Sequence, residues 1–536
     1  MIQNWKLSTL TAIALFGLIL SAACAAPRLQ PGQIQVSLHY DGLTQAVSVP
    51  SGSTARQAFD SIGVDVELLD RSEPPLYSVL SEGVAVQLVR VTEELQIQEE
   101  IIPFDTRTLL NESLPEGELR LVQPGQNGVQ ETTIRRVYEN GVEISSNPVQ
   151  SVTIVEPVAE IVMVGSQALF SPQPLHGRLA YISANNAWVM DRNTGTRNPI
   201  VTSGDLDGHI FSLSPDGAWL LYTRSDDDPD DEIINSLWLT RIDGEDDISI
   251  DLSTNNVIHF AAWVPRSNNR ISVSTVEFTT NPPGWSANND LILMNYSENG
   301  WVGERRTIIE PNSGGLYGWW GTYFAWSPDG EQLAFARPDS VGLVDFESAG
   351  FTPLYKLIPF QTGSDWAWVP GLTWSPDQTY LYTVSHIPQE GLISPEESPI
   401  FDLTAIPLVL GAPVSMAPEV GMFAYPVPSA STLGTSGERG YRLAFLTAMS
   451  PLQSLTSGYR LIVSDRDGSN AVMVFPPDGA PGLSPQYVAW SPAPSETDAP
   501  EFIAVIYQGN LWLVNALTGQ SHQLTGDGTI TALDWR

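Results

Sequence analysis

The chain of 536 residues contains a single cysteine, Cys24, and therefore a single thiol that could be modified or could bind a metal. Cys24 follows the basic residue Lys6, an apolar run at 7–20 and small residues at 21–23. A basic start, a short apolar core and small residues before the cut are the layout of a secretory signal peptide. The run is shorter than the about 20 apolar residues of a membrane-spanning helix. We predict a signal peptide at 1–24 and a mature chain that works outside the cytoplasm.

The position of Cys24 resembles the lipobox of bacterial lipoproteins, in which the cysteine becomes the first residue and carries a lipid. Ser21 stands where lipoboxes usually have leucine, and Leu20 lies one position earlier. The resemblance implies lipidation of Cys24 and anchoring to the cell membrane, within the cell envelope. A lipidated Cys24 would leave no thiol for a disulfide, a metal site or a nucleophile. Secretion without lipid, with cleavage near Ala26, is the alternative.

Tryptophans on two loops are candidates for ligand binding. The four candidates are Trp319, Trp320, Trp366 and Trp368. An exposed indole offers a flat apolar face that could stack on a sugar ring or another apolar ligand. Trp285, which follows a Pro-Pro-Gly sequence, is a further candidate. Packing inside the fold is the alternative for all of them.

An acidic run at 226–232 could collect a calcium ion through carboxylate oxygens. Its candidate ligands are Asp226, Asp228 and Asp230. The spacing does not match an EF-hand loop, and such a run is most often a solvated stretch of charge. Calcium is therefore the weaker of the two interpretations.

Catalytic motifs are few. The six histidines are scattered without metal-ligand spacing, and the sequence has no Gly-x-Ser-x-Gly elbow with a plausible triad. We therefore expect no metal, no cofactor and no enzymatic activity. A hydrolase built on two carboxylates that converge in space rather than in sequence stays open as an alternative.

The composition limits the classes of partner and fold. There are 25 Lys and Arg against 61 Asp and Glu, which gives a net charge of −36. Such a surface repels phosphate backbones, so nucleic-acid binding is excluded. The hydrophobic content of 42% is enough for packed cores. With 43 Gly, 41 Pro and few amphipathic helical patterns, the chain is predicted to be all-β, apart from a small α+β domain at the N-terminus.

That α+β domain is predicted at 34–92, after a short linker at 25–33. Alternating strands flank an Asp41-Gly42 turn, which is a strong hairpin signal. A helix follows from Thr54 to Ile62, with a capping residue at its start, and two further strands complete a β-grasp arrangement. The segment resembles the ubiquitin-like domain of unknown function found in bacterial cell-wall proteins.

The segment 95–167 contains five glycines, at 117, 125, 128, 141 and 165. They are predicted to be turn positions that need a positive φ, and Asn140-Gly141 is a candidate hairpin turn. The segment resembles the five-glycine (G-five) domain. The resemblance implies an extended, strand-rich module of cell-wall-binding proteins that binds N-acetylglucosamine-containing polymers.

From 170 to 536 the chain repeats a unit in which a strand leads through Ser-Pro-Asp-Gly into a second strand, with two more strands after it. The turn residues suit a type I turn. The strands before the turns are anchored by Leu213, Trp263, Trp326, Trp374, Tyr425, Trp490 and Trp535. Four-stranded units at a period of about 40–50 residues predict a β-propeller. The motifs resemble the TolB-like and WD-repeat-like families, and most repeat tryptophans are expected to pack between blades.

Seven anchors predict seven blades. The last anchor strand has no partners after it, and the first propeller strands have no anchor before them, so together they would complete one blade and close the ring. A six-bladed ring is the alternative, because the Tyr425 unit is the poorest match.

We therefore expect an extracytoplasmic, lipid-anchored envelope protein that binds peptidoglycan or another glycan through the five-glycine segment. Its propeller would be an interaction platform for a protein or ligand that the sequence does not identify. Two alternatives stay open: a propeller hydrolase acting on extracellular polysaccharide or peptide, and a TolB-like envelope assembly factor.

Overall fold

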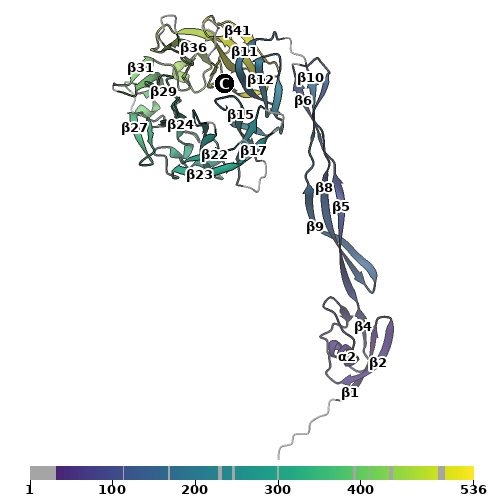
Figure 1. Ribbon diagram of the computed structural model, residues 1–536. Coiled ribbons are helices and arrows are strands. Elements are labelled where there is room, and N and C mark those ends of the chain that lie inside the picture. The colour runs from purple at the N-terminus through teal and green to yellow at the C-terminus, as the bar shows by residue number, and fades with distance from the viewer. Residues whose placement is uncertain are drawn as a thin grey trace, which may run out of the picture. The chain divides into compact units, whose positions relative to one another are not determined.

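The computed structural model describes residues 32–536 except 113, 167–169, 227–231, 244–247, 268, 298–300, 390, 392–393, 410, 434–438 and 493–500 (Figure 1). Cys24 and most of the 25–33 linker lie outside the described residues. The chain divides into two compact units. The first holds the described residues up to Arg107 together with Leu121–Val162, and the second holds Thr108–Arg120 together with Met163–Arg536. None of the helices in the described residues has the length and apolar character needed to cross a membrane.

The first unit begins with an α+β domain. Its elements are β1 (Gln33–Tyr40), β2 (Leu43–Pro50), α2 (Ala55–Ser61), β3 (Arg71–Glu73) and β4 (Ala85–Val89), and the sheet order is β2-β1-β4-β3. The predicted helix is confirmed, because Thr54 caps it and exchanges capping-box hydrogen bonds with Gln57. The predicted turn is confirmed as well, since Asp41 and Gly42 both have positive φ, as a type I′ turn requires. Phe59 of α2 is fully buried in the core of this domain.

Arg90 ties this domain to the sheet that follows it in the same unit. Its guanidinium makes two hydrogen bonds to Asp41, at 2.8 and 2.9 Å, and one of 2.8 Å to the buried Asp70 carboxylate. Its main-chain N–H donates to Asn140 Oδ1 at 3.0 Å. A bidentate pair of this kind fixes direction as well as distance. Arg90 therefore holds two hairpin turns together, that of β1–β2 and that at Asn140-Gly141.

The five-glycine segment forms two three-stranded sheets. The first is β5 (Val91–Ile102), β8 (Gly128–Glu139) and β9 (Val142–Val155), and the second is β6 (Thr106–Asn111), β10 (Glu160–Gly165) and β7 (Leu119–Gln123). The expectation of positive φ is confirmed at Gly117 and Gly141 and is wrong for the other three glycines. Those three are required by close approach: a Cβ on Gly128 would lie 2.5 Å from the Val155 carbonyl oxygen.

The second unit contains seven four-stranded antiparallel sheets among the described residues, which confirms the seven-bladed propeller (Figure 1). In hydrogen-bonded order, the first blade is β14 (Leu206–Leu213), β15 (Trp219–Ser225), β16 (Asn235–Arg241) and β17 (Ser249–Asn255), and the second is β18 (Phe260–Trp263), β19 (Arg270–Ser274), β22 (Leu291–Tyr296) and β23 (Val302–Ile309). The third blade is β24 (Tyr323–Trp326), β25 (Leu333–Arg337), β26 (Ser340–Asp345) and β27 (Gly350–Lys356). The fourth blade is β28 (Leu372–Trp374), β29 (Tyr380–Ile387), β30 (Ile400–Pro407) and β31 (Val414–Ala417).

The remaining three blades are β32 (Val427–Pro428), β35 (Arg442–Ala448), β36 (Tyr459–Asp465), β37 (Val472–Phe475); β38 (Ala489–Trp490), β39 (Phe502–Tyr507), β40 (Asn510–Asn515), β41 (Ser521–Gln523); and β42 (Ile530–Trp535), β11 (Pro174–Ser183), β12 (Asn186–Asn193), β13 (Asn198–Val201). The last of these joins the C-terminal strand to the first propeller strands, so the ring closes as predicted. Short elements outside the blades are β20 (Val276–Phe278), β21 (Trp285–Ala287), β33 (Thr432–Leu433), β34 (Arg439–Gly440), η1 (Gly318–Trp320), η2 (Pro395–Glu397) and η3 (Pro451–Gln453).

Repeat side chains build both the turns and the contacts between blades. In the Ser-Pro-Asp turn at 375–377 the Ser375 hydroxyl donates to Asp377 Oδ1 at 2.7 Å, and the other copies do the same. The Trp374 indole N–H donates to the Ala325 carbonyl of the preceding blade at 2.8 Å, and Trp490 donates to Val427 in the same way at 2.9 Å. The expectation that repeat tryptophans pack between blades is therefore confirmed.

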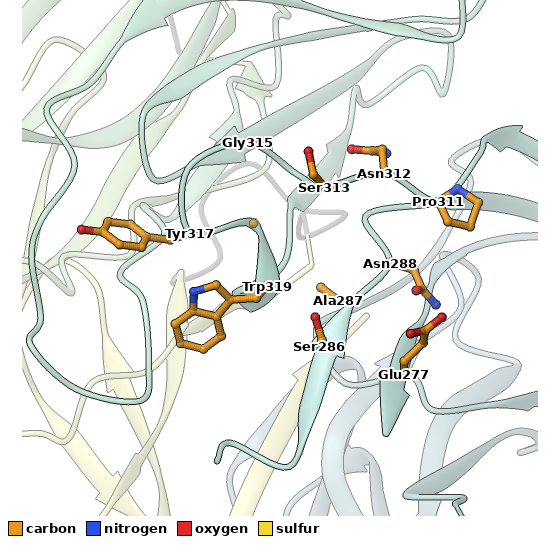
Figure 2. A pocket seen from close by; sticks show the side chains of 11 residues that line it. Glu277, Ser286, Ala287, Asn288, Pro311, Asn312, Ser313, Gly315, Tyr317 and Trp319 are labelled. Atoms are coloured by element: carbon orange, nitrogen blue, oxygen red, sulfur yellow. The ribbon is translucent and has the colours of Figure 1, made fainter. Parts of the chain in front are cut away.

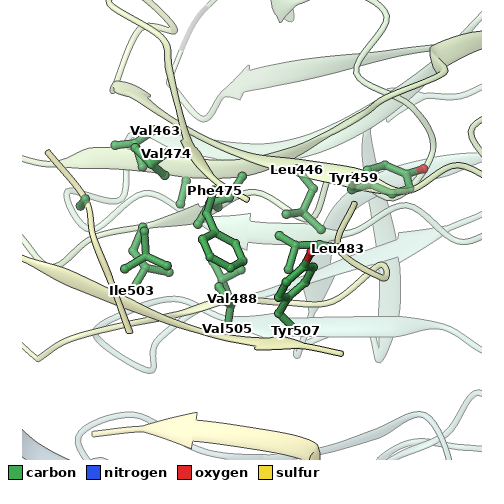
Figure 3. Close-up of a cluster of buried hydrophobic side chains, with 14 of the residues drawn as sticks. Leu446, Tyr459, Val463, Val474, Phe475, Leu483, Val488, Ile503, Val505 and Tyr507 are labelled. Atoms are coloured by element: carbon green, nitrogen blue, oxygen red, sulfur yellow. The ribbon is translucent and has the colours of Figure 1, made fainter. Parts of the chain in front are cut away.

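Apolar side chains of neighbouring blades fill the space between their sheets. Figure 3 shows one such cluster, which contains Leu446 and Tyr459 of one blade and Ile503 and Val505 of the next. Each of these side chains is almost fully buried. The blades thus form one continuous packed ring, and that ring positions the loops on its faces.

Candidate functional site

Two neighbouring connections on one face of the propeller form an open cleft of about 520 Å³ (Figure 2). One is the β20–β21 hairpin, which is inserted between β19 and β22. The other runs from β23 to β24 and contains η1. Strands alternate in direction within a blade, so the connection from its second to its third strand and the connection from its fourth strand to the next blade emerge on the same face. The cleft is lined by Glu277, Ser286, Ala287, Asn288, Pro311, Asn312, Ser313, Gly315, Tyr317, Gly318 and Trp319.

Trp319 is one of the predicted ligand-binding residues, and it lines the cleft with its indole partly exposed. Its ring meets Trp320 edge-on, with 5.7 Å between the ring centroids. Trp320 packs on Trp285 at 5.0 Å, and Trp285 stacks on His259 at 6.2 Å. Four aromatic rings therefore form a continuous series, which limits the orientations open to Trp319.

The loop that carries Trp319 is held by the fully buried side chain of Asn289. Its Nδ2 donates to the Gly318 carbonyl at 2.8 Å, and its Oδ1 accepts from the Thr322 hydroxyl at 2.7 Å. Two glycines let the loop pass this close. A Cβ on Gly314 would lie 2.4 Å from Asn289 Nδ2, and one on Gly318 would lie 1.9 Å from the Ser313 carbonyl oxygen.

Tyr317, beside Trp319 in the cleft, has a left-handed backbone conformation with φ of 54°. A bulky residue rarely adopts this conformation, and when it does the surrounding structure must hold it there. In Figure 2 the Tyr317 and Trp319 rings lie at one end of the cleft, and Glu277 and Asn288 lie at the other. The cleft thus has an aromatic end and a polar end.

A hydrogen-bonded series fixes the tautomer of His259. The Ser274 hydroxyl donates to Asp290 Oδ1 at 3.1 Å, and Ser274 Oγ lies 3.2 Å from His259 Nε2. A hydroxyl has one hydrogen, so Nε2 must donate to Ser274 and Nδ1 is left as an acceptor. The buried Nδ1 has no hydrogen-bond partner among the described residues. Burial lowers the pKa of His259 to about 4, so the ring is neutral at pH 7.

The second predicted loop behaves differently. Trp368 is 1% exposed and its indole N–H donates to the Met422 carbonyl at 3.0 Å. The expectation that Trp368 contacts a ligand is therefore wrong, since the ring is part of the core and packs on Phe401. Trp366 is partly exposed and lies against Phe423, with 6.4 Å between the ring centroids. It does not line the Trp319 cleft.

The calcium hypothesis concerns residues that the structure describes only in part. Asp226 is exposed at the end of β15, and Asp228 and Asp230 lie outside the described residues. In the part of the chain that is described, no group of three or more metal-ligating side chains is close enough to hold a metal ion. Calcium binding by the acidic run stays a prediction.

The number of carboxylates in the cleft is the observation that matters for the hydrolase alternative. A glycosidase needs two carboxyl groups about 5–10 Å apart on either side of the scissile bond. Among the described residues that line the cleft, Glu277 is the one carboxylate. Asp290 is not among the lining residues and is 3% exposed, and it accepts hydrogen bonds from Ser274 and Thr275. Its surroundings suit a structural acceptor.

The five-glycine segment can be assigned from its sequence. Residues 93–167 match the family model for the G5 domain. This segment is a G5 domain. The structure of the G5 domain of an IgA1 protease is 26% identical to it, over 15% of this chain and 94% of that chain, with a TM-score of 0.13.

The chain is also similar to larger solved structures. The β-propeller domain of the Trilobed protease from Pyrococcus furiosus is 12% identical, over 71% of this chain and 99% of that chain, with a TM-score of 0.33. An oligogalacturonate lyase, solved in complex with manganese, is 11% identical, over 76% and 97%, with a TM-score of 0.37. A comparison with curated protein sequences found no match. By its family match and its own sheet topology, the chain combines a G5 domain with a β-propeller.

Sequence reasoning found Trp319 but not the residues that position it. Asn289 and His259 lie in other connections, and only the fold brings them beneath the β23–β24 loop. A usable signal was the long spacing of 63 residues between the Trp263 and Trp326 anchors, because an insertion of that size has to lie on a face of the propeller.

Proposed function

We propose that the protein is a non-enzymatic glycan-binding protein of the bacterial cell envelope, exported and anchored through lipidated Cys24. In this proposal the G5 domain binds an N-acetylglucosamine-containing wall glycan, and the Trp319 cleft of the propeller binds a short oligosaccharide. The observation that carries the proposal is the partly exposed Trp319 indole, held by the Trp320–Trp285–His259 series beside polar side chains.

The chemistry of the cleft supports a sugar ligand. A sugar ring presents C–H groups on one face and hydroxyls around its edge. The Trp319 face suits the C–H groups, while the Glu277 carboxylate and the Asn288 amide suit the hydroxyls. The volume of about 520 Å³ falls in the range of about 300–1,000 Å³ that is common for small-molecule sites.

Binding is favoured over hydrolysis because the described lining contributes one carboxylate. A hydrolase would release new reducing ends from a polysaccharide, or new amino termini from a peptide. The purified protein is expected to release neither. Release of either product, lost on substitution of Glu277, would support the hydrolase alternative.

The test is titration calorimetry of the mature protein with N-acetylglucosamine oligomers, together with co-sedimentation on insoluble peptidoglycan. Trp319→Ala is expected to remove the calorimetric signal assigned to the cleft. Trp301→Ala is the matched control, because Trp301 is 69% exposed and lies outside the cleft. Equal effects of the two substitutions, or no binding by the unmodified protein, would contradict the proposal.

The anchoring proposal has its own test. Cells fed a labelled fatty acid are expected to label the unmodified protein and not the Cys24→Ala variant. Equal labelling of the two proteins, or none of either, would leave secretion without lipid as the explanation.

A further inference from the structure

We infer that the Trp319 cleft selects sugars that carry a free amino group, with the Glu277 carboxylate binding the ammonium ion. The inference rests on the proposed glycan-binding function and specifies the class of sugar.

The first observation is the position of Glu277. It lies in β20 directly opposite Ser286 of β21, and both side chains line the cleft. Glu277 is exposed, and none of the ion pairs formed by the described residues includes it. Its carboxylate is therefore available to a ligand, at the polar end of the cleft in Figure 2.

The second observation is the lack of an opposing charge. No lysine or arginine is among the described residues that line the cleft. Arg337 comes within reach of the lining, with Nη2 3.5 Å from Asn312 Oδ1. Its guanidinium, however, lies 3.8 Å from the centre of the Phe351 ring and donates to the Thr322 hydroxyl at 3.0 Å, so its charge is held away from Glu277 by other partners.

The net charge of the whole chain also favours a cationic ligand. A net charge of −36 raises the local concentration of cations and lowers that of anions, most strongly at low ionic strength. Sugars with carboxylate groups would be repelled. N-acetylated sugars are neutral and would be neither attracted nor repelled by this charge, whereas protonated amino sugars would be attracted to the cleft.

The aromatic end adds a second attraction for the same ligand. An ammonium ion near the face of an indole is stabilised by the ring quadrupole, and an acetamide is not. An ammonium group also offers three donors to carboxylate and amide oxygens, whereas an acetamide offers one. A glucosamine oligomer can therefore place the ammonium group of one unit at Glu277 and that of another unit near Trp319 (Figure 2).

The test is calorimetric titration of the mature protein at about pH 6, where an amine of this kind is protonated. The ligands are glucosamine oligomers, N-acetylglucosamine oligomers of the same length and a lysine oligomer. The amino sugar is expected to bind about tenfold more tightly than its acetylated form, and added salt is expected to reduce the difference. Glu277→Gln should remove this preference, so that the affinity for the amino sugar falls about tenfold more than the affinity for the acetylated oligomer. Glu304→Gln is the control, because it removes one exposed charge that lies outside the cleft.

Three results would overturn the inference, and they are distinguishable. If Glu277→Gln keeps the preference while Trp319→Ala removes binding of both oligomers, the inference fails and the proposed function stands. If neither sugar binds the unmodified protein, both fail. If the lysine oligomer binds as tightly as the amino sugar and does not depend on Trp319, the carboxylate recognises basic peptide.

Discussion

The buried Asn289 amide donates a hydrogen bond of 2.8 Å to the carbonyl of Gly318, one residue before the cleft tryptophan Trp319. Asn289 lies in the connection between β21 and β22, and Gly318 lies in the connection that leads to the next blade. The bond therefore joins these two connections and holds the loop that carries the Trp319 ring. It makes the geometry of the cleft depend on a residue that no ligand would touch.

Replacing Asn289 should weaken the attachment of the β23–β24 loop, which carries Trp319. Asn289→Ala removes the bonds to the Gly318 carbonyl and the Thr322 hydroxyl, which keep their bonds to the Gly321 N–H and to Arg337 Nε. The loss of two hydrogen bonds should cost about 2 kcal/mol of stability. Asn289→Asp keeps the size of the side chain but cannot donate to Gly318. Both variants are expected to lose affinity for the sugar, as measured by calorimetry, while Asn281→Ala in the exposed β20–β21 turn should not. Unchanged affinity in Asn289→Asp would show that the loop does not need this bond.

Alanine substitutions of Trp319 and Trp368 should have opposite effects on affinity and on stability. Trp368→Ala removes a ring that is 1% exposed, and substitutions of this kind cost about 3–5 kcal/mol. Trp319→Ala removes a partly exposed ring and should lower affinity with little loss of thermal stability. Thermal unfolding and calorimetry on the same two variants separate these effects. A large stability loss in Trp319→Ala would assign that ring to packing.

Local turn chemistry made much of the fold predictable. The capping box of Thr54 and the Asn140-Gly141 hairpin turn depend on neighbours in sequence, so their signals are visible there. The blade count followed from a repeated turn and an anchor residue in each unit. Even the weak Tyr425 unit formed a blade, although its inner strand, Val427–Pro428, is only two residues long.

The candidate site was harder to predict because its residues come from three separate connections. Trp319 and Trp368 look alike in sequence, since each lies in a loop beside a second tryptophan. Only the packing of Phe401 and the Met422 carbonyl shows that Trp368 is buried. The glycines at 125, 128 and 165 were likewise misjudged, because a close approach by a distant backbone leaves no local pattern.

His259 should make the propeller less stable in mild acid. Its pKa is lowered from 6.5 to about 4 by burial, so the unfolded chain binds the proton first as the pH falls. The contribution of neutral His259 is fully present above pH 6.5 and is lost between pH 6.5 and about pH 4, to a total of about 3 kcal/mol. Denaturant unfolding across this range measures the slope. The slope should be smaller in His259→Phe, whose ring can still stack on Trp285.

The control for this slope is His209→Phe, because His209 is exposed on the same propeller. His209→Phe removes an exposed imidazole and leaves the buried one in place, so the slope is expected to match that of the unmodified protein. If the two variants lose the same part of the slope, His259 is not its source.

Arg90 should make the stability of the first unit depend on pH in a lower range than the one set by His259. Its hydrogen bond lowers the pKa of Asp41. Burial acts to raise the pKa of Asp70, but hydrogen bonds from the Val91 and Glu67 main-chain N–H groups and from Arg90 outweigh it and lower the value. Carboxylates with lowered pKa stabilise the fold above their unfolded value of 3.8, and this contribution is lost as the pH falls through the folded values.

Arg90→Leu leaves the Asp70 carboxylate buried without its cation, so the first unit should lose about 3 kcal/mol at pH 7. The difference from the unmodified protein should shrink below pH 3.8, where the carboxylates become protonated. Hydrogen exchange of peptides around Asp70 and Asn140 in the full chain measures this loss of stability near Arg90. Arg135→Leu is the matched control, because it breaks a pair with Glu93 on an exposed sheet surface and should change exchange little. Equal effects of the two substitutions would mean that Arg90 acts as an ordinary surface charge.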